Sequence, residues 1–386
     1  MRHVLIALFA LTAAQACSPA ETNAAALNAT PETLTSVVAR AAPGDIVSLA
    51  PGDYGDGYLR GRSFPEPVTL VSADSAKPAR FRTLAIVSMT GLVLRDLKVE
   101  LTPDAKTQGH TPALRIANSK QILVDEVRIK GSPAISGVSE DTDRNAPRNT
   151  ANVIGRPTAR GVSIENSSDI TIENSEISEH LHGIVVNGTD ITIRRNQLHH
   201  MRKSFILGTA ERLTIEDNHL HSPQPWNYGG NGDHGDFIAL WGRANQTSPA
   251  RDIRIRHNLL EQGDGAPFIG MLIGSSPGFT GMEITDNVLL MTGAQGIALM
   301  NVTGVVARNT LLRTGGGPKD APSILLRANS NVTVEDNVLT DTYRTIAKAA
   351  APSVFKRNKS LSDAVAPPAK QDQARSGWLA ARARAN

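Results

Sequence analysis

The sequence predicts an all-β fold: a single right-handed parallel β-helix with coils of about 22 residues and a capping helix at its N-terminal end. Three observations predict it. A short apolar motif containing one Asn at a fixed place returns along the chain, and apolar residues alternate with polar ones within each copy. A second strand-like segment precedes each copy by about 13 residues. Each repeat therefore supplies short strands to one coil, and the stacked coils bury one continuous core.

The repeated motif has the form ITIRRNQL or VTVEDNVL. Its Asn recurs at Asn174, Asn196, Asn218, Asn258, Asn287, Asn309, Asn337 and Asn358. Earlier, degenerate copies carry Asp96 and Glu126 at the same place. Stacked Asn side chains at a bend form a ladder that satisfies backbone groups left unpaired by the turn. Leucine-rich repeats have similar spacing, but β-branched residues dominate here.

The first coil needs a cover, because an open solenoid end exposes unpaired strand groups. Thr30 is a suitable N-cap, Pro31 suits the first helical position, and Glu32 makes the first turn acidic. An apolar helical stripe follows at Leu34, Val37, Val38 and Ala41. These residues predict the N-terminal capping helix.

The predicted β-helix spans residues 31–365 and is followed by a tail or cap over residues 366–386. Trp378, Leu379 and a run of Ala and Arg leave two alternatives open for this segment, a covering helix or a loose tail.

The N-terminus has the pattern of an export signal over residues 1–17, followed by a linker over residues 18–30. A basic start precedes an apolar run over residues 4–14, which is too short to cross a membrane. Cys17 follows small residues, as in bacterial lipoprotein signals whose new N-terminal Cys is acylated; the alternative is simple cleavage with a passive Cys17. We expect export to the periplasm, to the outer membrane through a lipid anchor, or out of the cell.

The composition excludes several classes of protein. A 40% hydrophobic content with a net charge of +3 excludes a disordered chain. A single Cys excludes an internal disulfide framework. The nearly balanced charge offers no electrostatic footprint for nucleic acid, and we expect a monomer.

The coil pattern, the segment APGDIVSLAPGDY after the predicted helix, and the recurrent Asn together resemble the pectate-lyase-like superfamily of secreted right-handed β-helix proteins. The resemblance covers about residues 31–365. Most characterised members of that superfamily cleave or epimerise acidic polysaccharides, while others are hydrolases, phage tailspikes or adhesins. The resemblance therefore implies the fold and an acidic polysaccharide partner, but several activities remain open.

Two insertions interrupt the repeat, at about residues 132–158 and 219–236, with a shorter one after Trp241. Insertions in a solenoid project from one face, which is often the binding face. The residues expected to contact sugar there are Trp226, Tyr228, Trp241 and Arg243. The alternative is a loop that folds its own aromatic side chains over the solenoid.

Histidines concentrate in the same region. Seven of the ten fall between residues 180 and 234: His180, His182, His199, His200, His219, His221 and His234. Aligned coils predict one column of Arg160, His182, Ser204, Asp236 and Gln295, a second of His180, Arg202 and His234, and a third of His199 and His221. A shift of one residue would bring Lys203 into the first column. Arg160 and His180 are expected to bind substrate.

These residues suit β-elimination of a uronic acid. A lyase must neutralise the carboxylate, remove the proton beside it and protonate the leaving oxygen. The candidates are Arg202, Arg160 or Ca²⁺ for the first role, His182, Lys203 or His234 for the second, and a His, Tyr228 or Arg243 for the third. Asp236 completes the catalytic set, and Asp233 with Asp236 could bind Ca²⁺. A C5-epimerase uses the same first two steps.

Three other interpretations remain open. A hydrolase would use Asp233 and Asp236, with Asp264 as a further carboxylate. Zinc could bind His180 with His182, or His199 with His221. A non-catalytic adhesin would show a long smooth face without a titratable cluster. We therefore predict an exported polysaccharide lyase, with the epimerase, the hydrolase and the glycan-binding solenoid as alternatives.

Overall fold

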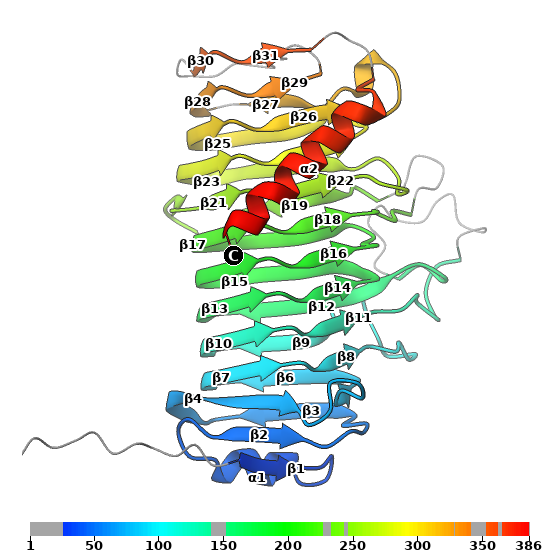
Figure 1. Ribbon diagram of the computed structural model, residues 1–386, viewed down its shortest axis with the longest axis vertical. Helices are drawn as coiled ribbons and strands as arrows, with labels where there is room; N and C mark the ends of the chain where they lie inside the picture. The colour runs from blue at the N-terminus through cyan, green and yellow to red at the C-terminus, as the bar shows by residue number, and fades with distance from the viewer. Residues whose placement is uncertain are drawn as a thin grey trace, which may run out of the picture.

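The computed structural model describes residues 26–139, 152–226, 233–242, 246–327, 329–340, 353–361 and 365–385. Parallel strands stack from coil to coil along one axis (Figure 1) and form a sheet of 20 strands and a second sheet of 11 strands. Each coil contributes strands to both sheets, so the chain winds as a β-helix. The predicted fold class is confirmed. The expected export signal, including Cys17, and most of the expected linker lie outside the described residues.

The strands are short, and most are set by period-two alternation of apolar residues. In the 20-stranded sheet they are β1 (Ala26–Ala29), β2 (Ile46–Leu49), β3 (Asp56–Arg60), β4 (Ser63–Ser72), β6 (Thr83–Val87), β7 (Thr90–Arg95), β9 (Pro112–Ala117), β10 (Lys120–Asp125), β12 (Thr158–Glu165), β13 (Ser167–Glu173), β15 (His180–Arg194), β17 (Ser204–Glu216), β19 (Asp236–Leu240), β20 (Ala250–Arg251), β21 (Arg254–Arg256), β23 (Ile269–Thr285), β25 (Gln295–Ala307), β27 (Ser323–Leu326), β28 (Asn331–Glu335) and β30 (Val354–Lys356). In the 11-stranded sheet they are β5 (Arg80–Phe81), β8 (Lys98–Glu100), β11 (Arg128–Lys130), β14 (Glu176–Ser178), β16 (Gln197–His199), β18 (His219–His221), β22 (Leu259–Glu261), β24 (Val288–Met291), β26 (Thr310–Arg313), β29 (Val338–Leu339) and β31 (Lys359–Ser360). A 3₁₀ turn, η1 (Pro318–Asp320), precedes β27.

The core consists of columns of aliphatic side chains that run along the solenoid. One column passes through Leu94, Val124, Ile172, Ile193, Ile215, Ile255, Ile284, Val306 and Val334, which the strand pairing stacks one above another. All nine are at most 1% exposed. Because each aliphatic side chain packs on its counterpart in the next coil, one core extends through the stacked coils.

Seven Asn side chains, all buried except the partly exposed Asn358, form the ladder: Asn196, Asn218, Asn258, Asn287, Asn309, Asn337 and Asn358. In each step the side-chain oxygen of one Asn accepts the backbone N–H of the Asn in the preceding coil, at 2.9–3.1 Å. The side-chain nitrogen donates to a backbone carbonyl, as from Asn258 to Ile215. The ladder thus satisfies backbone groups at a bend that the strands leave unpaired.

Asn174, Asp96 and Glu126 were wrongly placed in this ladder. The pairing of β14 with β16 aligns Ser175, not Asn174, with Asn196, and the Ser175 N–H donates to the Asn196 side chain at 3.0 Å. Asn174, Asp96 and Glu126 instead occupy the preceding position, where φ is +50° to +54°. Asn and Asp tolerate the left-handed region, which explains why Asn174 and Asp96 suit this position.

A short helix, α1 (Leu34–Arg40), lies against the first coil and buries Leu34, Val37 and Val38. It begins later than expected, because Thr30 starts a turn and accepts the N–H groups of Thr33 and Leu34. The N-cap is Thr33, its side chain does not cap the helix, and the first turn holds no acidic residue.

The main helix of the structure is C-terminal. Helix α2 (Pro368–Ala385) runs obliquely across the outer face of the 11-stranded sheet and does not cover the end of the solenoid (Figure 1). Trp378 packs among Leu259, Val288, Leu290 and Leu312, and its ring N–H donates to the carbonyl of His257 at 2.5 Å. Of the two alternatives for this segment, the structure has a helix. In the described part of the chain, neither helix has the length and apolarity needed to span a membrane.

Both major insertions connect the 11-stranded sheet to the 20-stranded sheet. The first lies between β11 and β12, and the second lies between β18 and β19. The second therefore begins at Ser222, because His219 and His221 belong to β18. The two insertions contact each other where Trp226 packs against Val153.

Candidate functional site

Four polar residues from successive coils form one column in the 20-stranded sheet. In stacking order they are Arg160 of β12, His182 of β15, Ser204 of β17 and Asp236 of β19. Neighbours in such a parallel ladder lie about 4.8 Å apart. Ile269 pairs with Asp236 and separates the polar column from Gln295, the next member expected in this column.

The column faces away from the core. A Cβ placed on Gly183 would lie 3.2 Å from the core side chains of Leu198 and Met201, so this position faces inward. Adjacent residues of a strand face opposite sides, and His182 therefore faces outward. Arg160 and His182 are partly exposed, whereas Asp236 is 4% exposed. A polymer lying along the solenoid axis would meet Arg160 and His182, whereas Ser204, which is 3% exposed, and Asp236 lie beneath the surface.

His182 is kept neutral by its surroundings. Burial, with smaller contributions from the nearby cations Lys203, Arg160 and Arg202, lowers its pKa to about 3. Its Nδ1 atom has no hydrogen-bond partner among the described residues. Burial also lowers the pKa of Lys203 to about 8, although Asp233 opposes the shift. At neutral pH the column thus offers an uncharged imidazole beside cationic groups.

Asp236 and His234 form a second titratable pair. Nδ1 of His234 lies 3.5 Å from Oδ2 of Asp236, and the His234 side chain is 59% exposed. The hydrogen bond to Asp236 raises the pKa of His234, while burial raises the pKa of Asp236. Oδ1 of Asp236 has no hydrogen-bond partner in the described part of the chain. His234 is therefore protonated more readily than His182.

Arg202, Asp233 and Trp226 hold the second insertion on the solenoid. Nε and Nη2 of Arg202 donate to the two oxygens of Asp233 at 2.7 and 2.9 Å, and both side chains are completely buried. The guanidinium lies 5.7 Å from the ring centre of Trp226, and the backbone N–H of Trp226 also donates to Asp233 at 2.8 Å. A bidentate ion pair closed off from solvent makes a strong anchor.

The structure corrects the expected roles of four residues: Arg202, Trp226, His180 and Asp233. Arg202 is fully buried and paired, so it does not reach a substrate, and Trp226 is 0% exposed and offers no face to a sugar ring. His180 is also 0% exposed, and burial lowers its pKa to about 3, so it is a neutral core residue. The oxygens of Asp233 are taken by Arg202 and the Trp226 N–H, and this donor set does not fit calcium.

Among the described residues, no group of three or more His, Cys, Asp or Glu is arranged to hold a metal ion. Tyr228 and Arg243, expected to bind or protonate substrate, lie outside the described residues. Trp241 follows β19 and is 37% exposed, and its backbone N–H donates to Gly208. Of the predicted site residues, the structure therefore brings Arg160, His182, Lys203, His234 and Asp236 together in one region.

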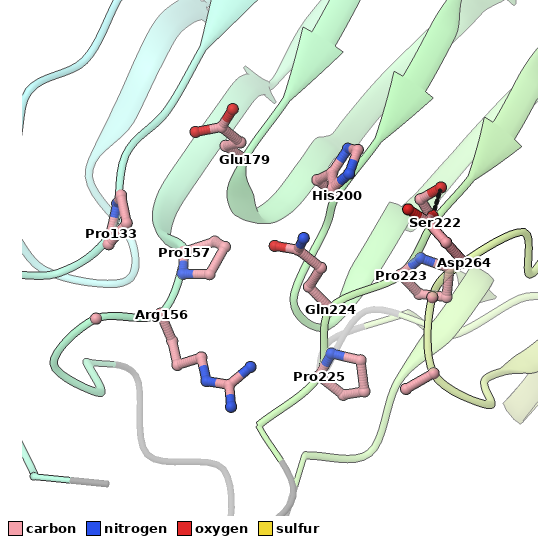
Figure 2. A pocket seen from close by; sticks show the side chains of 13 residues that line it. Pro133, Arg156, Pro157, Glu179, His200, Ser222, Pro223, Gln224, Pro225 and Asp264 are labelled. Carbon is pink, nitrogen blue, oxygen red and sulfur yellow. Dashed lines mark hydrogen bonds between the residues drawn. The ribbon is translucent and has the colours of Figure 1, made fainter.

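A pocket that the sequence did not predict opens between the two insertions. It encloses about 500 Å³, and its lining includes Glu179, His200, Ser222 and Asp264 (Figure 2). Glu179, His200 and Ser222 directly follow successive strands of the 11-stranded sheet, each with a left-handed φ between +54° and +61°. The histidine-rich strand ends were the one signal of this pocket in the sequence, because its walls come from the distant insertions.

The strand pairing and the outward polar column define a right-handed parallel β-helix with a candidate site on its flank. The family described as a right handed beta helix region matches residues 105–260. The chain is similar to an alginate lyase from Paenibacillus sp. str. FPU-7, with 15% identity, 86% of this chain and 97% of that chain covered, and a TM-score of 0.50. This likeness shows a shared fold.

Two further solved structures are similar at lower scores. The surface adhesin PfbA of Streptococcus pneumoniae has 13% identity, a TM-score of 0.44, and coverage of 75% of this chain and 82% of its own. The catalytic unit of a GH87 α-1,3-glucanase from Streptomyces thermodiastaticus strain HF3-3 has 14% identity, a TM-score of 0.46, and coverage of 85% and 64%. The search of curated proteins gave no significant match.

Proposed function

We propose that this protein is an exported carbohydrate-active enzyme that cleaves a uronic-acid-containing polysaccharide by β-elimination. The observation that carries the proposal is the outward column of Arg160, His182, Ser204 and Asp236 on four successive coils. Its cationic end suits the carboxylate of a uronic acid, and its other end carries the His234–Asp236 pair.

Arg160 and Lys203 would neutralise the uronate carboxylate. Arg160 is partly exposed, and its Nε atom is buried without a hydrogen-bond partner among the described residues. A guanidinium binds a carboxylate through two parallel hydrogen bonds, which withdraws charge and acidifies the proton at C5. Lys203 is 3.7 Å from Asp233 and adds positive charge from below the surface.

His182 would remove the C5 proton, and His234 would protonate the leaving oxygen. His182 is neutral at pH 7, so its lone pair is available, and the charge of a bound uronate would offset the cations that now lower its pKa. His234 has the opposite tendency, because Asp236 raises its pKa. Two groups whose surroundings separate their pKa values suit a base and an acid. His182 and Asp236 are two coils apart, about 10 Å along the stack.

The test is a panel of alginate, polygalacturonate, polyglucuronate, chondroitin and hyaluronan with the purified protein. We expect ultraviolet absorbance of an unsaturated uronate to grow with one of them. His182→Gln should lower kcat at least about 100-fold, since general base catalysis is worth about 10²–10⁴. The same replacement at His257, whose side chain is 38% exposed and which lies between β21 and β22 outside the column, is the matched control and should leave kcat unchanged.

The other activities give different outcomes in the same panel. A C5-epimerase would exchange the C5 proton with deuterium from solvent without cleavage, because it shares the first two steps. A hydrolase would produce reducing ends without absorbance; the burial of Asp233 against Arg202 disfavours it. Full activity of His182→Gln would refute the proposed base, and no reaction in any assay would favour a glycan-binding protein.

Export and attachment through an acylated Cys17 remain part of the proposal. Mass spectrometry of the N-terminal peptide from a bacterial host would reveal the acyl chain. An N-terminal peptide that starts at the cleavage site without an acyl chain would refute the lipid anchor.

We further propose that the protein is a monomer whose sole partner is the polysaccharide. Light scattering tests the oligomeric state.

A further inference from the structure

The pocket between the two insertions has a row of side chains along one side. Glu179, His200 and Ser222 lie on successive coils, where the N–H of Glu179 donates to the carbonyl of His199 and that of His200 to the carbonyl of His221. Figure 2 shows this row, with Gln224 between it and Arg156 of the first insertion. Asp264 stands at the Ser222 end of the row.

One chain of hydrogen bonds determines the tautomer of His200. Glu176 accepts from Nε2 of His199 at 3.2 Å, because a carboxylate only accepts. Burial lowers the pKa of His199, so its Nδ1 carries a lone pair. Nδ1 of His200 lies 2.6 Å from that atom and must donate to it. Neutral His200 is therefore protonated on Nδ1, and its Nε2 atom is a hydrogen-bond acceptor.

A second chain determines the hydroxyl of Ser222. Its proton is donated to Asp264 at 2.5 Å, since the carboxylate has none to give. Nδ1 of His221 lies 3.1 Å from the same hydroxyl oxygen and must donate to it. Nε2 of His221 then accepts, which agrees with the Gln197 side-chain nitrogen at 2.9 Å. Ser222 can only accept a further hydrogen bond from the pocket.

The row thus offers acceptors at every coil. Glu179 contributes a carboxylate, one oxygen of which lies 3.2 Å from Lys130, and His200 contributes its Nε2 lone pair. Ser222 and Asp264 complete the row with a hydroxyl oxygen and a second carboxylate. Such a row requires a ligand that donates hydrogen bonds, and it repels an anion.

The remaining walls suit a sugar. Four prolines, Pro133, Pro157, Pro223 and Pro225, present C–H surface, while Arg156 and Gln224 supply donors. A sugar hydroxyl both donates and accepts, so it can bridge the two sides of the pocket. The volume of about 500 Å³ lies within the usual range for pockets that bind small molecules.

We propose that this pocket is a second saccharide site, which binds a non-acidic sugar unit through hydroxyl donors to Glu179, His200, Ser222 and Asp264. The saccharide class rests on the proposed function, whereas the preference for donors over carboxylates rests on the pocket alone. The substrate polymer would then carry neutral units beside its uronic acids, or the pocket would hold a separate neutral glycan.

The test uses pairs of oligosaccharides that differ only at C6: mannotriose against trimannuronate, cellotriose against its glucuronate counterpart, and galactotriose against trigalacturonate. Binding to the full-length protein is followed through the ring nitrogens of His200 and His182 by NMR. We expect one neutral trisaccharide to shift the Nε2 signal of His200, and its uronate to do so at least about 10-fold more weakly. In the free protein, the His200 signal should be that of an Nδ1-protonated ring.

Two variants test the pocket independently of the polar column, and both introduce residues that a left-handed backbone accepts. His200→Asn and Ser222→Gly introduce residues that tolerate a positive φ, and each should weaken neutral binding at least about 10-fold. Because His200→Asn removes the NMR probe, isothermal titration calorimetry measures binding to the variants and to the parent protein. His257→Asn, the same change at another left-handed position outside the pocket, is the control. Equal binding of neutral and acidic partners at His200, Nε2 protonation of the free ring, or no binding by any neutral trisaccharide would overturn the proposal. None of these readouts measures lyase activity. Failure of the proposed lyase function can therefore be distinguished from failure of the second saccharide site.

Discussion

Replacing Asn258 with Ala will destabilise the solenoid far more than the same replacement of Asn174, although both stand in copies of one motif. Asn258 is 0% exposed. Its side-chain oxygen accepts both the backbone N–H and the side-chain N–H of Asn218, and its side-chain nitrogen donates to Ile215 and Asn287. Asn174 is exposed, and its side chain donates to the Asp125 carboxylate and accepts from Arg195.

The magnitude follows from the groups left behind. Without the Asn258 side chain, the buried backbone N–H of Asn218 has lost its acceptor, at a cost of about 1–3 kcal/mol. The bonds to the Asn218 side chain and the Ile215 carbonyl add about 0.5–1.5 kcal/mol each. The sum is about 2–6 kcal/mol. At Asn174 the main cost is that Ala disfavours φ of +50°, about 1–2 kcal/mol.

Guanidinium unfolding followed by circular dichroism measures both variants beside the parent protein. We expect the unfolding midpoint of Asn258→Ala to fall clearly below that of Asn174→Ala, with similar slopes. Equal midpoints would refute the reasoning, because ladder side chains would then add nothing beyond what an exposed Asn adds.

Two further predictions concern the insertion and the C-terminal helix. Asp233→Asn leaves Arg202 buried without a counter-charge, so unfolding should cost about 3–5 kcal/mol less and limited proteolysis should cut the second insertion faster. Burial favours a raised pKa for Glu261, but hydrogen bonds from His219 and Arg375 outweigh it and lower the pKa to about 2. Since the unfolded value is near 4.5, this contact stabilises α2 fully above about pH 4.5 and is lost toward pH 2, where tryptophan fluorescence should report release.

Each of these two has a matched control. Asp190→Asn breaks the exposed ion pair with Arg212 and should cost at most about 1 kcal/mol. Unchanged proteolysis of the insertion in Asp233→Asn would contradict the anchor. Glu261→Gln should show the acid-state fluorescence already at neutral pH, and parent-like fluorescence at both pH values would contradict the role of Glu261.

The periodicity of the sequence was enough to predict the coils and one candidate column. Coils stack by simple translation, so residues at equivalent places, such as Arg160, His182 and Asp236, lie above one another whatever surrounds them. The same reasoning failed by one residue at Asn174. There the motif places Asn one residue before Ser175, and only hydrogen bonding decides which of the two enters the ladder.

The roles of single side chains depended on where the insertions run. Arg202 is equivalent to its column neighbours in sequence, but the second insertion returns over it and pairs it with Asp233. Trp226 looked like a sugar platform because aromatic residues are scarce, and it is instead sealed between the insertions. The pocket of His200 escaped prediction for the same reason, since Arg156 approaches it from a distant segment.

The sequence by itself determined the architecture, because alternation of apolar residues and a repeat near 22 residues are local properties that recur in every coil. The tertiary structure alone decided burial, pairing and tautomer at the candidate sites. Those depend on irregular segments, where no period relates the residues that meet, and on hydrogen bonds whose direction follows from partners far away in the chain, as Glu176 determines the free nitrogen of His200 through His199.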